Sequence, residues 1–145
     1  ATICDLTICS DKAVFGQVGP KMGSVDPGYG TAFLARVVGE KKAREIWFLC
    51  RRYSAAEAEK MGLVNKVVPD AELDAAAFEY ARELASGPTF ALGVAKKMFK
   101  MMHQPDLETF LDTEAWAQGL ALLTEDHSEG VKAFFEKRKA VFQGR

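Results

Sequence analysis

Glycine and proline crowd residues 15–30, and this segment restricts the possible folds more than any other part of the chain. It holds five glycines and two prolines in sixteen positions, which excludes a long helix or strand. Near its end, Asp26 is a predicted N-cap and Pro27 a first helical residue. Ser24 and Asp26 are the residues of the segment with obvious chemistry. Because functional groups often lie on loops that regular elements hold in place, we predict the candidate site here.

The composition favours one ordinary globular core. Of the 145 residues, 48% are hydrophobic and 27% are charged. The formal net charge is −1, whereas binding to nucleic acid or to an anionic membrane needs a marked basic excess, so we expect neither partner. No apolar stretch approaches the roughly 20 residues that span a bilayer, and the first residues do not resemble a signal peptide. We therefore predict a cytoplasmic protein.

The cysteines form neither a metal-binding nor a disulfide pattern. Cys4, Cys9 and Cys50 are odd in number and include no CxxC pair, which fits neither a zinc site nor a disulfide framework. Each lies in an apolar run, which predicts buried, reduced thiols. We accordingly predict no metal site.

The first half of the chain alternates short strands with helices. The pattern predicts strands over residues 6–9, 13–15 and 63–69, and helices over residues 27–38, 41–51 and 54–61. Ser54 and Glu57 form a capping box that opens the third helix, and Gly62 ends it. This half is therefore predicted to be mixed α/β.

No strand is predicted from residue 70 onward. Turn signals at Gly87-Pro88, Gln104-Pro105 and Thr124-Glu125-Asp126 divide this part into four helices. The predicted organisation is thus an α/β part over residues 1–69 and a helical part over residues 70–145. Methionines and aromatic residues recur at helical spacing in the helical part, which indicates a core or a subunit interface, with a ligand tunnel as the alternative.

Several short motifs, spread over nearly the whole chain, point to one family. They are Phe15-Gly16-Gln17, Tyr29-Gly30-Thr31, Met61-Gly62-Leu63-Val64-Asn65 and Phe134-Phe135-Glu136-Lys137-Arg138. With them the chain resembles the crotonase (enoyl-CoA hydratase/isomerase) superfamily. Residues 19–26 and 41–47 are similar to the branch that holds 1,4-dihydroxy-2-naphthoyl-CoA synthase and 2-ketocyclohexanecarboxyl-CoA hydrolase.

This resemblance implies both a fold and an assembly. The expected fold is α/β, the C-terminal part of a crotonase-like (ClpP/crotonase) spiral, followed by a helical trimerisation region. The expected partners are an acyl-CoA substrate and further copies of the chain, in a homotrimer or hexamer. No tightly bound cofactor is implied, because coenzyme A enters as part of the thioester substrate.

The resemblance also implies a type of chemistry. Family members stabilise a thioester enolate with two backbone N–H donors, which form an oxyanion hole. By resemblance both donors lie in a preceding half, the second just before the position of Ala1. The complete enzyme is expected to act on a cyclic or β-keto acyl-CoA as a carbon–carbon lyase or hydrolase. The alternatives are an enoyl-CoA hydratase/isomerase, or a non-catalytic remnant that only self-associates.

Gly19 departs from the pattern of the hydratases in the superfamily. The resemblance places their catalytic glutamate at this position, so simple hydration by that route is not expected here. In some synthases of the branch a bicarbonate ion stands in for the missing carboxylate, which makes bicarbonate a possible ligand of this chain. The alternative is that glycine is needed at position 19 only for the shape of the backbone.

Ser24 and Asp26 match the active-site serine and aspartate of the branch. Against these roles, Asp26 is explained equally well as a helix N-cap, and Ser24 as a turn residue. The active-site tyrosine of the branch aligns with Leu122, which cannot donate a proton. Either the chemistry is altered, or Tyr29 or Tyr80 supplies the missing donor.

The last predicted helix carries Phe134, Lys137, Arg138 and Lys139. By resemblance, Phe134 contacts the adenine of coenzyme A and Lys137 contacts a phosphate. The alternative is that this basic run only interacts favourably with the helix dipole.

Overall fold

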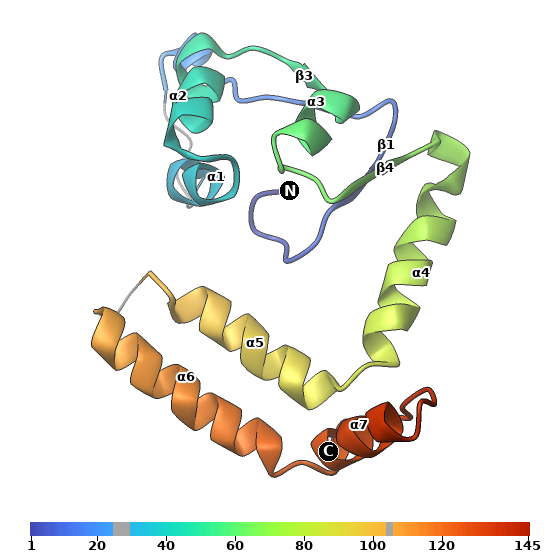
Figure 1. Ribbon diagram of the computed structural model, residues 1–145. Coiled ribbons are helices and arrows are strands. Elements are labelled where there is room, and N and C mark those ends of the chain that lie inside the picture. The colour runs from blue at the N-terminus through green and yellow to red at the C-terminus, as the bar shows by residue number, and fades with distance from the viewer. Residues whose placement is uncertain (25–29, 104–105) are drawn as a thin grey trace. The chain divides into compact units, whose positions relative to one another are not determined.

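The computed structural model describes residues 1–24, 30–103 and 106–145, and these divide into two compact units (Figure 1). The first unit is Ala1–Phe78 and the second is Glu79–Arg145. The division falls inside helix α4 (Leu73–Ala85). Each unit is described by itself below.

The first unit combines short strands with helices. Its elements are β1 (Ile8–Ser10), β2 (Val14–Phe15), the 3-10 helix η1 (Pro20–Met22), α1 (Gly30–Val38), α2 (Glu40–Leu49), β3 (Tyr53–Ser54), α3 (Ala55–Lys60), β4 (Lys66–Val68), the 3-10 helix η2 (Asp70–Glu72) and the start of α4. Strands β1 and β4 pair in parallel, with Cys9 opposite Val67, and β2 pairs antiparallel to β3. The mixed α/β prediction for this part is confirmed.

The third predicted strand is shorter than expected. It covers residues 66–68 instead of 63–69, because Gly62 and Leu63 are used to end α3. The backbone N–H of Leu63 donates to the carbonyl of Ala58 at 2.9 Å. Asn65 then pairs with Thr7 without strand geometry, since its side-chain oxygen accepts from Thr7 N at 2.7 Å and its own N–H donates to Thr7 O at 2.8 Å.

The glycine-rich segment contains no long regular element among its described residues, as predicted. Between β2, which ends at Phe15, and α1, which begins at Gly30, the described residues form one element, the three-residue helix η1, whose C-cap Gly23 has a φ of +68°. Gly16 lies so close to the backbone of Arg51 that an added Cβ would be 2.9 Å from the carbonyl oxygen. The predicted N-cap Asp26 and Pro27 lie outside the described residues.

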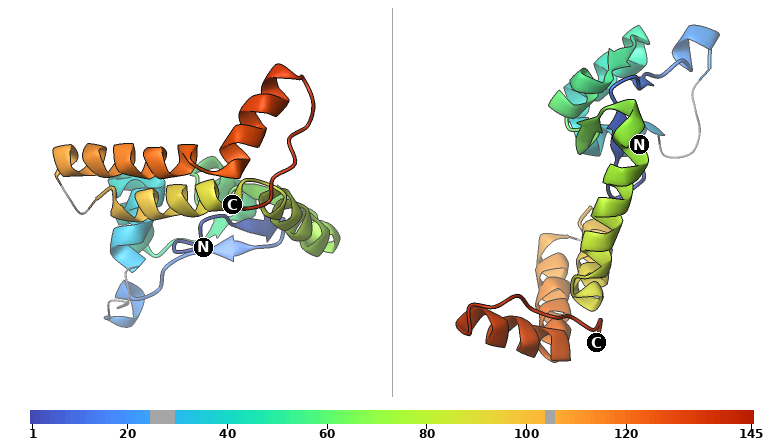
Figure 2. Two further views of the ribbon diagram at one scale, coloured as in Figure 1. Left: turned by 90° about the horizontal axis from the view of Figure 1, so that it is seen from below. Right: turned by 90° about the vertical axis from the view of Figure 1, so that its right-hand side faces the viewer.

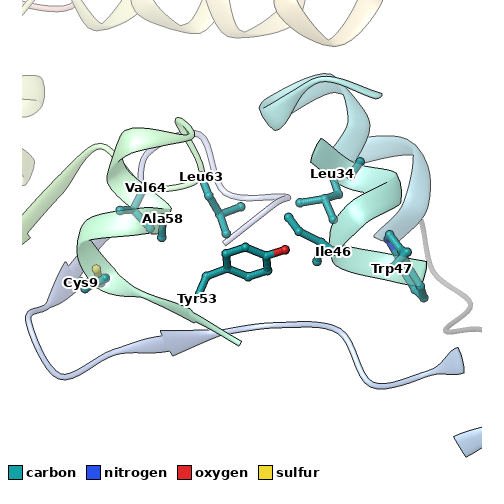
Figure 3. Close-up of a cluster of buried hydrophobic side chains, with 10 residues drawn as sticks. Cys9, Leu34, Ile46, Trp47, Tyr53, Ala58, Leu63 and Val64 are labelled. Carbon is teal, nitrogen blue, oxygen red and sulfur yellow. The ribbon is translucent and has the colours of Figure 1, made fainter. Parts of the chain in front are cut away.

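One cluster of buried side chains forms the core of the first unit (Figure 3). Its members come from β1, α1, α2, β3, α3 and the turn after α3: Cys9, Leu34, Ala43, Ile46, Trp47, Tyr53, Ala55, Ala58, Leu63 and Val64. The capping box predicted for α3 is confirmed, because Ser54 Oγ accepts from Glu57 N at 3.3 Å and Glu57 accepts from Ser54 N at 2.8 Å. This box fixes the start of α3, whose Ala58 is completely buried.

Past residue 70, the described residues form helices and no strand. After α4 follow α5 (Thr89–Met101), α6 (Leu107–Leu122) and α7 (Glu125–Phe135), so the prediction of four helices is confirmed for the described part. Helices α5 and α6 run side by side, and the chain after α7 turns back along that helix (Figure 2). No described helix is both long and apolar enough to cross a membrane.

The predicted burial of the cysteines is wrong for two of the three, and one of the two alternatives for the apolar side chains of α5 and α6 does not hold within this chain. Cys4 is exposed and Cys50 half-buried, so among the three free thiols only Cys9 is buried as expected. The aromatic residues of α5 and α6 do not form a core, because no residue of either helix is fully buried. Phe99, for example, is 74% exposed and Trp116 is 78% exposed. An interface with another chain remains a prediction for this surface.

Candidate functional site

Gly19 adopts a backbone conformation that does not require glycine. It is the N-cap of η1, with φ −48° and ψ −59°, which lies in the ordinary right-handed helical region. Its carbonyl oxygen accepts N–H bonds from Met22 and Ser24, both at 2.9 Å. The dihedral angles therefore give no support to the alternative that glycine serves only the backbone shape.

The structure describes Ser24 but not Asp26, so it does not test whether the two side chains meet. Ser24 is exposed, its backbone N–H donates to Gly19 O at 2.9 Å, and it lines neither of the two cavities of the first unit described below. Asp26 and Tyr29 lie outside the described residues. Their catalytic roles remain predictions.

A cavity of about 360 Å³ lies next to the glycine-rich segment. It is lined by η1, α1 and α2, through Pro20, Thr31, Ala35, Glu40, Ala43, Arg44, Trp47 and Phe48. Trp47 is only 5% exposed, and its indole N–H is buried without a hydrogen-bond partner among the residues that the structure describes. A buried donor without a partner costs about 1–3 kcal/mol, so this N–H is a candidate for binding an acceptor.

A second polar group in the first unit was missed by sequence reasoning. The Tyr53 hydroxyl donates to Glu45 Oε1 at 2.9 Å, and Lys42 Nζ donates to both oxygens of Glu45 at 3.1 Å. Burial, followed by this bond to Glu45, raises the pKa of Tyr53. The hydrogen bond from Lys42 lowers the pKa of Glu45. Only the helical spacing of Lys42 and Glu45 could have indicated this cluster.

Tyr53 also lines a small cavity. It shares about 160 Å³ with Phe15, Gly16 and Gln17 of the glycine-rich segment and with the first residues of the chain. Since its proton is held by a carboxylate and its pKa is raised, Tyr53 is a poor acid. It is better suited to fixing α2 against β3 than to proton transfer.

The predicted coenzyme A contacts lie at the end of α7, but not both in the helix. Helix α7 ends at Phe135, so the expectation that Lys137 belongs to it is wrong. Lys137 follows the helix in a left-handed conformation, with φ +53°. Phe134 is 79% exposed and Lys137 is also exposed. Phe134 borders a cavity of about 470 Å³ together with Phe135 and Phe142.

Arg138 is not free to bind a ligand. Its guanidinium donates to both oxygens of Glu129, at 2.6 and 2.8 Å, and to Glu136 Oε2 at 2.6 Å. Glu129 Oε1 also accepts the backbone N–H of Val141 at 2.9 Å. These bonds, led by that from Arg138, lower the pKa of Glu129 to about 2.

The returning C-terminal segment is tied to the first turn of α7. Asp126 is buried at 3% exposure, and its carboxylate accepts the backbone N–H groups of Gln143 at 2.6 Å and Gly144 at 2.8 Å. The Asp126 N–H in turn donates to the carbonyl of Arg145 at 3.0 Å. The segment that carries Lys137 is therefore held at both ends.

The low pKa of Glu129 predicts a pH dependence of stability. Because the folded-state pKa of about 2 lies below the ordinary value of 4.5, the stabilisation is complete above about pH 4.5 and is lost as the pH falls toward 2. Thermal unfolding of the wild type and of Glu129→Gln should therefore differ most above pH 4.5 and converge near pH 2. Glu125→Gln is the matched control, since its ion pair with Arg145 is 71% exposed on both sides. A difference that persists unchanged at pH 2 would contradict the assignment.

The remaining candidates are placed as follows. Leu122 is the last residue of α6 and is 49% exposed. Tyr80 lies on α4 and is half-buried. Within the described residues, no group of three or more His, Cys, Asp or Glu side chains could hold a metal ion.

Comparison with known proteins gives a consistent result. A family model described as enoyl-CoA hydratase/isomerase matches residues 1–145. Among solved structures, a putative enoyl-CoA hydratase/isomerase from Mycobacterium abscessus is 32% identical, with a TM-score of 0.93 over 100% of this chain and 56% of its own length.

Two further solved structures are equally similar in sequence. An enoyl-CoA hydratase from Bacillus anthracis is 36% identical, with a TM-score of 0.88 over 99% of this chain and 56% of its own. Human enoyl coenzyme A hydratase domain-containing protein 3 is 35% identical, with a TM-score of 0.83 over 97% of this chain and 55% of its own. The predicted crotonase-type fold is thereby confirmed, and the chain spans slightly more than half the length of these structures.

Proposed function

Because the chain belongs to the enoyl-CoA hydratase/isomerase family, we propose that it forms part of an enzyme that processes acyl-CoA thioesters. The proposed substrate is a cyclic or β-keto acyl-CoA, and the proposed reaction is carbon–carbon bond cleavage or hydrolysis through a thioester enolate. The observation that carries this choice is Gly19, which has an ordinary helical backbone and no carboxylate where the hydratases have one. The sequence likeness to the lyase and hydrolase branch supports the same choice.

The enolate needs its negative charge held by preorganised donors. We place both oxyanion N–H groups outside residues 1–145, in a region that corresponds to the remaining length of the relatives. One such donor contributes about 2.7–4 kcal/mol to transition-state stabilisation, so the catalytic rate of the complete enzyme depends on that region. Within this chain, Ser24 and Asp26 would flank the acyl group.

Asp26 is better suited to orienting the substrate than to removing a difficult proton. An N-cap carboxylate is stabilised by backbone N–H groups and by the positive end of the helix. Such stabilisation favours the charged form and makes the carboxylate a weaker base. The proposed role of Asp26 is therefore a hydrogen bond to the substrate.

Bicarbonate is the proposed stand-in for the carboxylate that position 19 lacks. The proposed place is the neighbouring cavity, which Pro20 borders next to Gly19, and the candidate donor is Trp47, which lines the cavity and whose buried indole N–H has no partner among the described residues. When bound, bicarbonate would supply the carboxylate that the hydratases carry on a side chain. Trp47 would hold it by donating its N–H.

Replacing Trp47 by phenylalanine tests this role. The change keeps an aromatic ring and removes the N–H, and a hydrogen bond to an anion contributes about 1.5–3 kcal/mol. We therefore expect the half-saturating bicarbonate concentration to rise roughly 10- to 100-fold in turnover assays with buffers depleted of carbon dioxide. Phe48→Leu, which changes an exposed ring at the same cavity, should leave that concentration unchanged. If the turnover rate of the wild type does not depend on the bicarbonate concentration, the proposal is wrong.

Phe134 and Lys137 are the proposed contacts of coenzyme A. Lys137 is exposed and makes no ion pair with another described residue, so its ammonium is available for a phosphate. Phe134 offers an exposed ring to the adenine. The neighbouring Arg138 is already neutralised by two carboxylates and adds no further charge.

A homotrimer or hexamer is the proposed assembly. Helices α5 and α6 enclose an apolar groove of about 650 Å³, lined mostly by alanine, methionine and aromatic side chains. Large apolar surfaces of this kind mark interaction sites in folded proteins. The proposed occupant is another copy of the chain.

One assay distinguishes the proposed function from two alternatives. The names of the relatives favour the first alternative, enoyl-CoA hydratase/isomerase activity. The second alternative is a remnant without catalysis. The protein would be incubated with β-ketoacyl-CoA and with enoyl-CoA. Cleavage of the first, by water, to an acyl-CoA and a new carboxylic acid and hydration of the second would be followed separately. Cleavage of the β-keto substrate supports our proposal, and hydration supports the first alternative. Binding of coenzyme A without turnover of either substrate supports the second.

A further inference from the structure

Lys137 holds a backbone conformation that usually belongs to glycine. The N–H of Lys137 donates to Phe134 O at 3.2 Å, and the N–H of Arg138 donates to Ala133 O at 3.1 Å. This pair of bonds is the Schellman ending of a helix, in which the left-handed residue is most often glycine. Lys137 fills that position with φ +53°.

The same chain contains a matched ending with glycine. At the end of α3, the N–H of Gly62 donates to Glu59 O at 3.0 Å and the N–H of Leu63 donates to Ala58 O at 2.9 Å. Gly62 has φ +77° and no side chain to strain. Because an identical turn forms with glycine, the turn itself does not require a lysine at position 137. A side chain in a strained position points to a role for that side chain.

Charged side chains before and after Lys137 in the sequence form ion pairs that fix the turn. Arg138 Nε donates to Oε2 of Glu136, the residue before Lys137, at 2.6 Å. The Arg138 guanidinium makes two further bonds to Glu129 in α7. Glu129 also accepts the N–H of Val141, which fixes the chain beyond the turn. Paired Arg–carboxylate bonds of this kind are both strong and directional.

The ion pairs of Arg138 also occupy the carboxylates that could otherwise pair with Lys137. Glu136 is the acidic neighbour in sequence that could neutralise the lysine, and it is paired with Arg138 instead. Glu129 is likewise taken up by Arg138. The Lys137 ammonium is thereby left exposed, next to the exposed ring of Phe134.

We propose that Glu129 and Arg138 are positioning residues for an anionic ligand of Lys137: they hold the lysine in its left-handed conformation and keep its ammonium unpaired for a phosphate. This inference rests on the proposed contact between Lys137 and coenzyme A. It adds that the contact depends on two residues that do not themselves touch the ligand.

The first test compares affinity with stability at position 137. Coenzyme A binding by calorimetry and thermal unfolding would be measured for the wild type, Lys137→Ala and Lys137→Gly. We expect both variants to bind coenzyme A roughly 10-fold more weakly, since each loses one charge-assisted bond. Lys137→Gly should also raise the unfolding midpoint by about 2–4 °C, because glycine removes the strain. A midpoint for Lys137→Gly that is equal to or below that of Lys137→Ala would overturn the strain argument.

The second test asks whether Glu129 acts through Lys137. Glu129→Gln keeps the shape of the side chain and removes its charge, and it should weaken coenzyme A binding about 3- to 10-fold. In the Lys137→Ala background the same change should have no further effect, because there is no ammonium left to position. Arg138→Lys keeps the charge but not the paired geometry, and it should act in the same direction as Glu129→Gln. Pantetheine, which lacks the phosphates, should bind all variants alike.

The outcomes separate this inference from the proposed function. If the wild type does not bind coenzyme A, or Lys137→Ala binds it as tightly as the wild type, the coenzyme A contact itself is wrong. If Lys137→Ala weakens binding but Glu129→Gln and Arg138→Lys do not, only the positioning role is wrong. A loss caused by Glu129→Gln that is equally large in the Lys137→Ala background would show a general structural effect instead. Glu125→Gln serves as the control on the same helix.

Discussion

Replacing Asp26 by asparagine is expected to lower kcat roughly 10- to 100-fold in an enzyme that cleaves β-ketoacyl-CoA. Asparagine keeps the size and the capping ability of the side chain, so the helix start is preserved. The change removes the negative charge, and a hydrogen bond made by a charged group contributes about 1.5–3 kcal/mol, which corresponds to roughly this factor. The measurement is the initial rate of β-ketoacyl-CoA cleavage to acyl-CoA and carboxylic acid at saturating substrate.

The structural role of Asp26 is separated from the catalytic one by two further measurements. Thermal unfolding of Asp26→Asn should match the wild type, because only the charge is lost. Asp74→Asn changes an exposed acidic residue in the first turn of α4 and should leave kcat unaffected. If Asp26→Asn turned over substrate at the wild-type rate, position 26 would be only a helix cap and the catalytic assignment would be wrong.

Replacing Leu34 by alanine is expected to destabilise the protein by about 2–5 kcal/mol. Leu34 is 2% exposed and is the largest side chain among the most deeply buried residues of the described chain. It packs from α1 into the cluster that includes Ile46 and Tyr53 (Figure 3). Deleting its branched end leaves a cavity whose lining cannot fully collapse. Urea unfolding measures the effect.

Val37 provides the comparison for Leu34 on the same helix. It is 40% exposed, so Val37→Ala removes little buried surface and should cost less than about 1 kcal/mol. Equal losses for Leu34→Ala and Val37→Ala would mean that α1 does not pack into this core as the structure shows.

Sequence patterns predict helices and strands correctly where residues close together in the sequence determine the structure. The capping box of Ser54 and Glu57 forms as predicted, because both partners lie in one helical turn. The strand after Gly62 was predicted too long, because residues 63–65 look like a strand but are used to end α3 and to bind Thr7. That contact joins Asn65 to a residue 58 positions away, which no local pattern contains.

The candidate site was only partly predictable. Family motifs identified Gly19, Phe134 and Lys137, but not the geometry around them. Lys137 was assigned to the helix, because lysine is a good helix former and a left-handed lysine is locally unfavourable. Trp47 lines a cavity together with Pro20 and buries an indole N–H without a partner among the described residues, and no pattern in the sequence indicates either feature.

By itself, the sequence determined the family, the order of strands and helices, and the absence of a glutamate at position 19. These depend on residue identity and on short spacings. Only the tertiary structure decided that Trp47 buries an N–H without a partner among the described residues, that no side chain of α5 or α6 is fully buried, and that Arg138 pairs with Glu136 across Lys137 in the sequence. The physical reason is that side-chain burial, ion pairing and backbone strain depend on contacts between residues that are far apart in the sequence. Short sequence patterns do not contain information about those contacts.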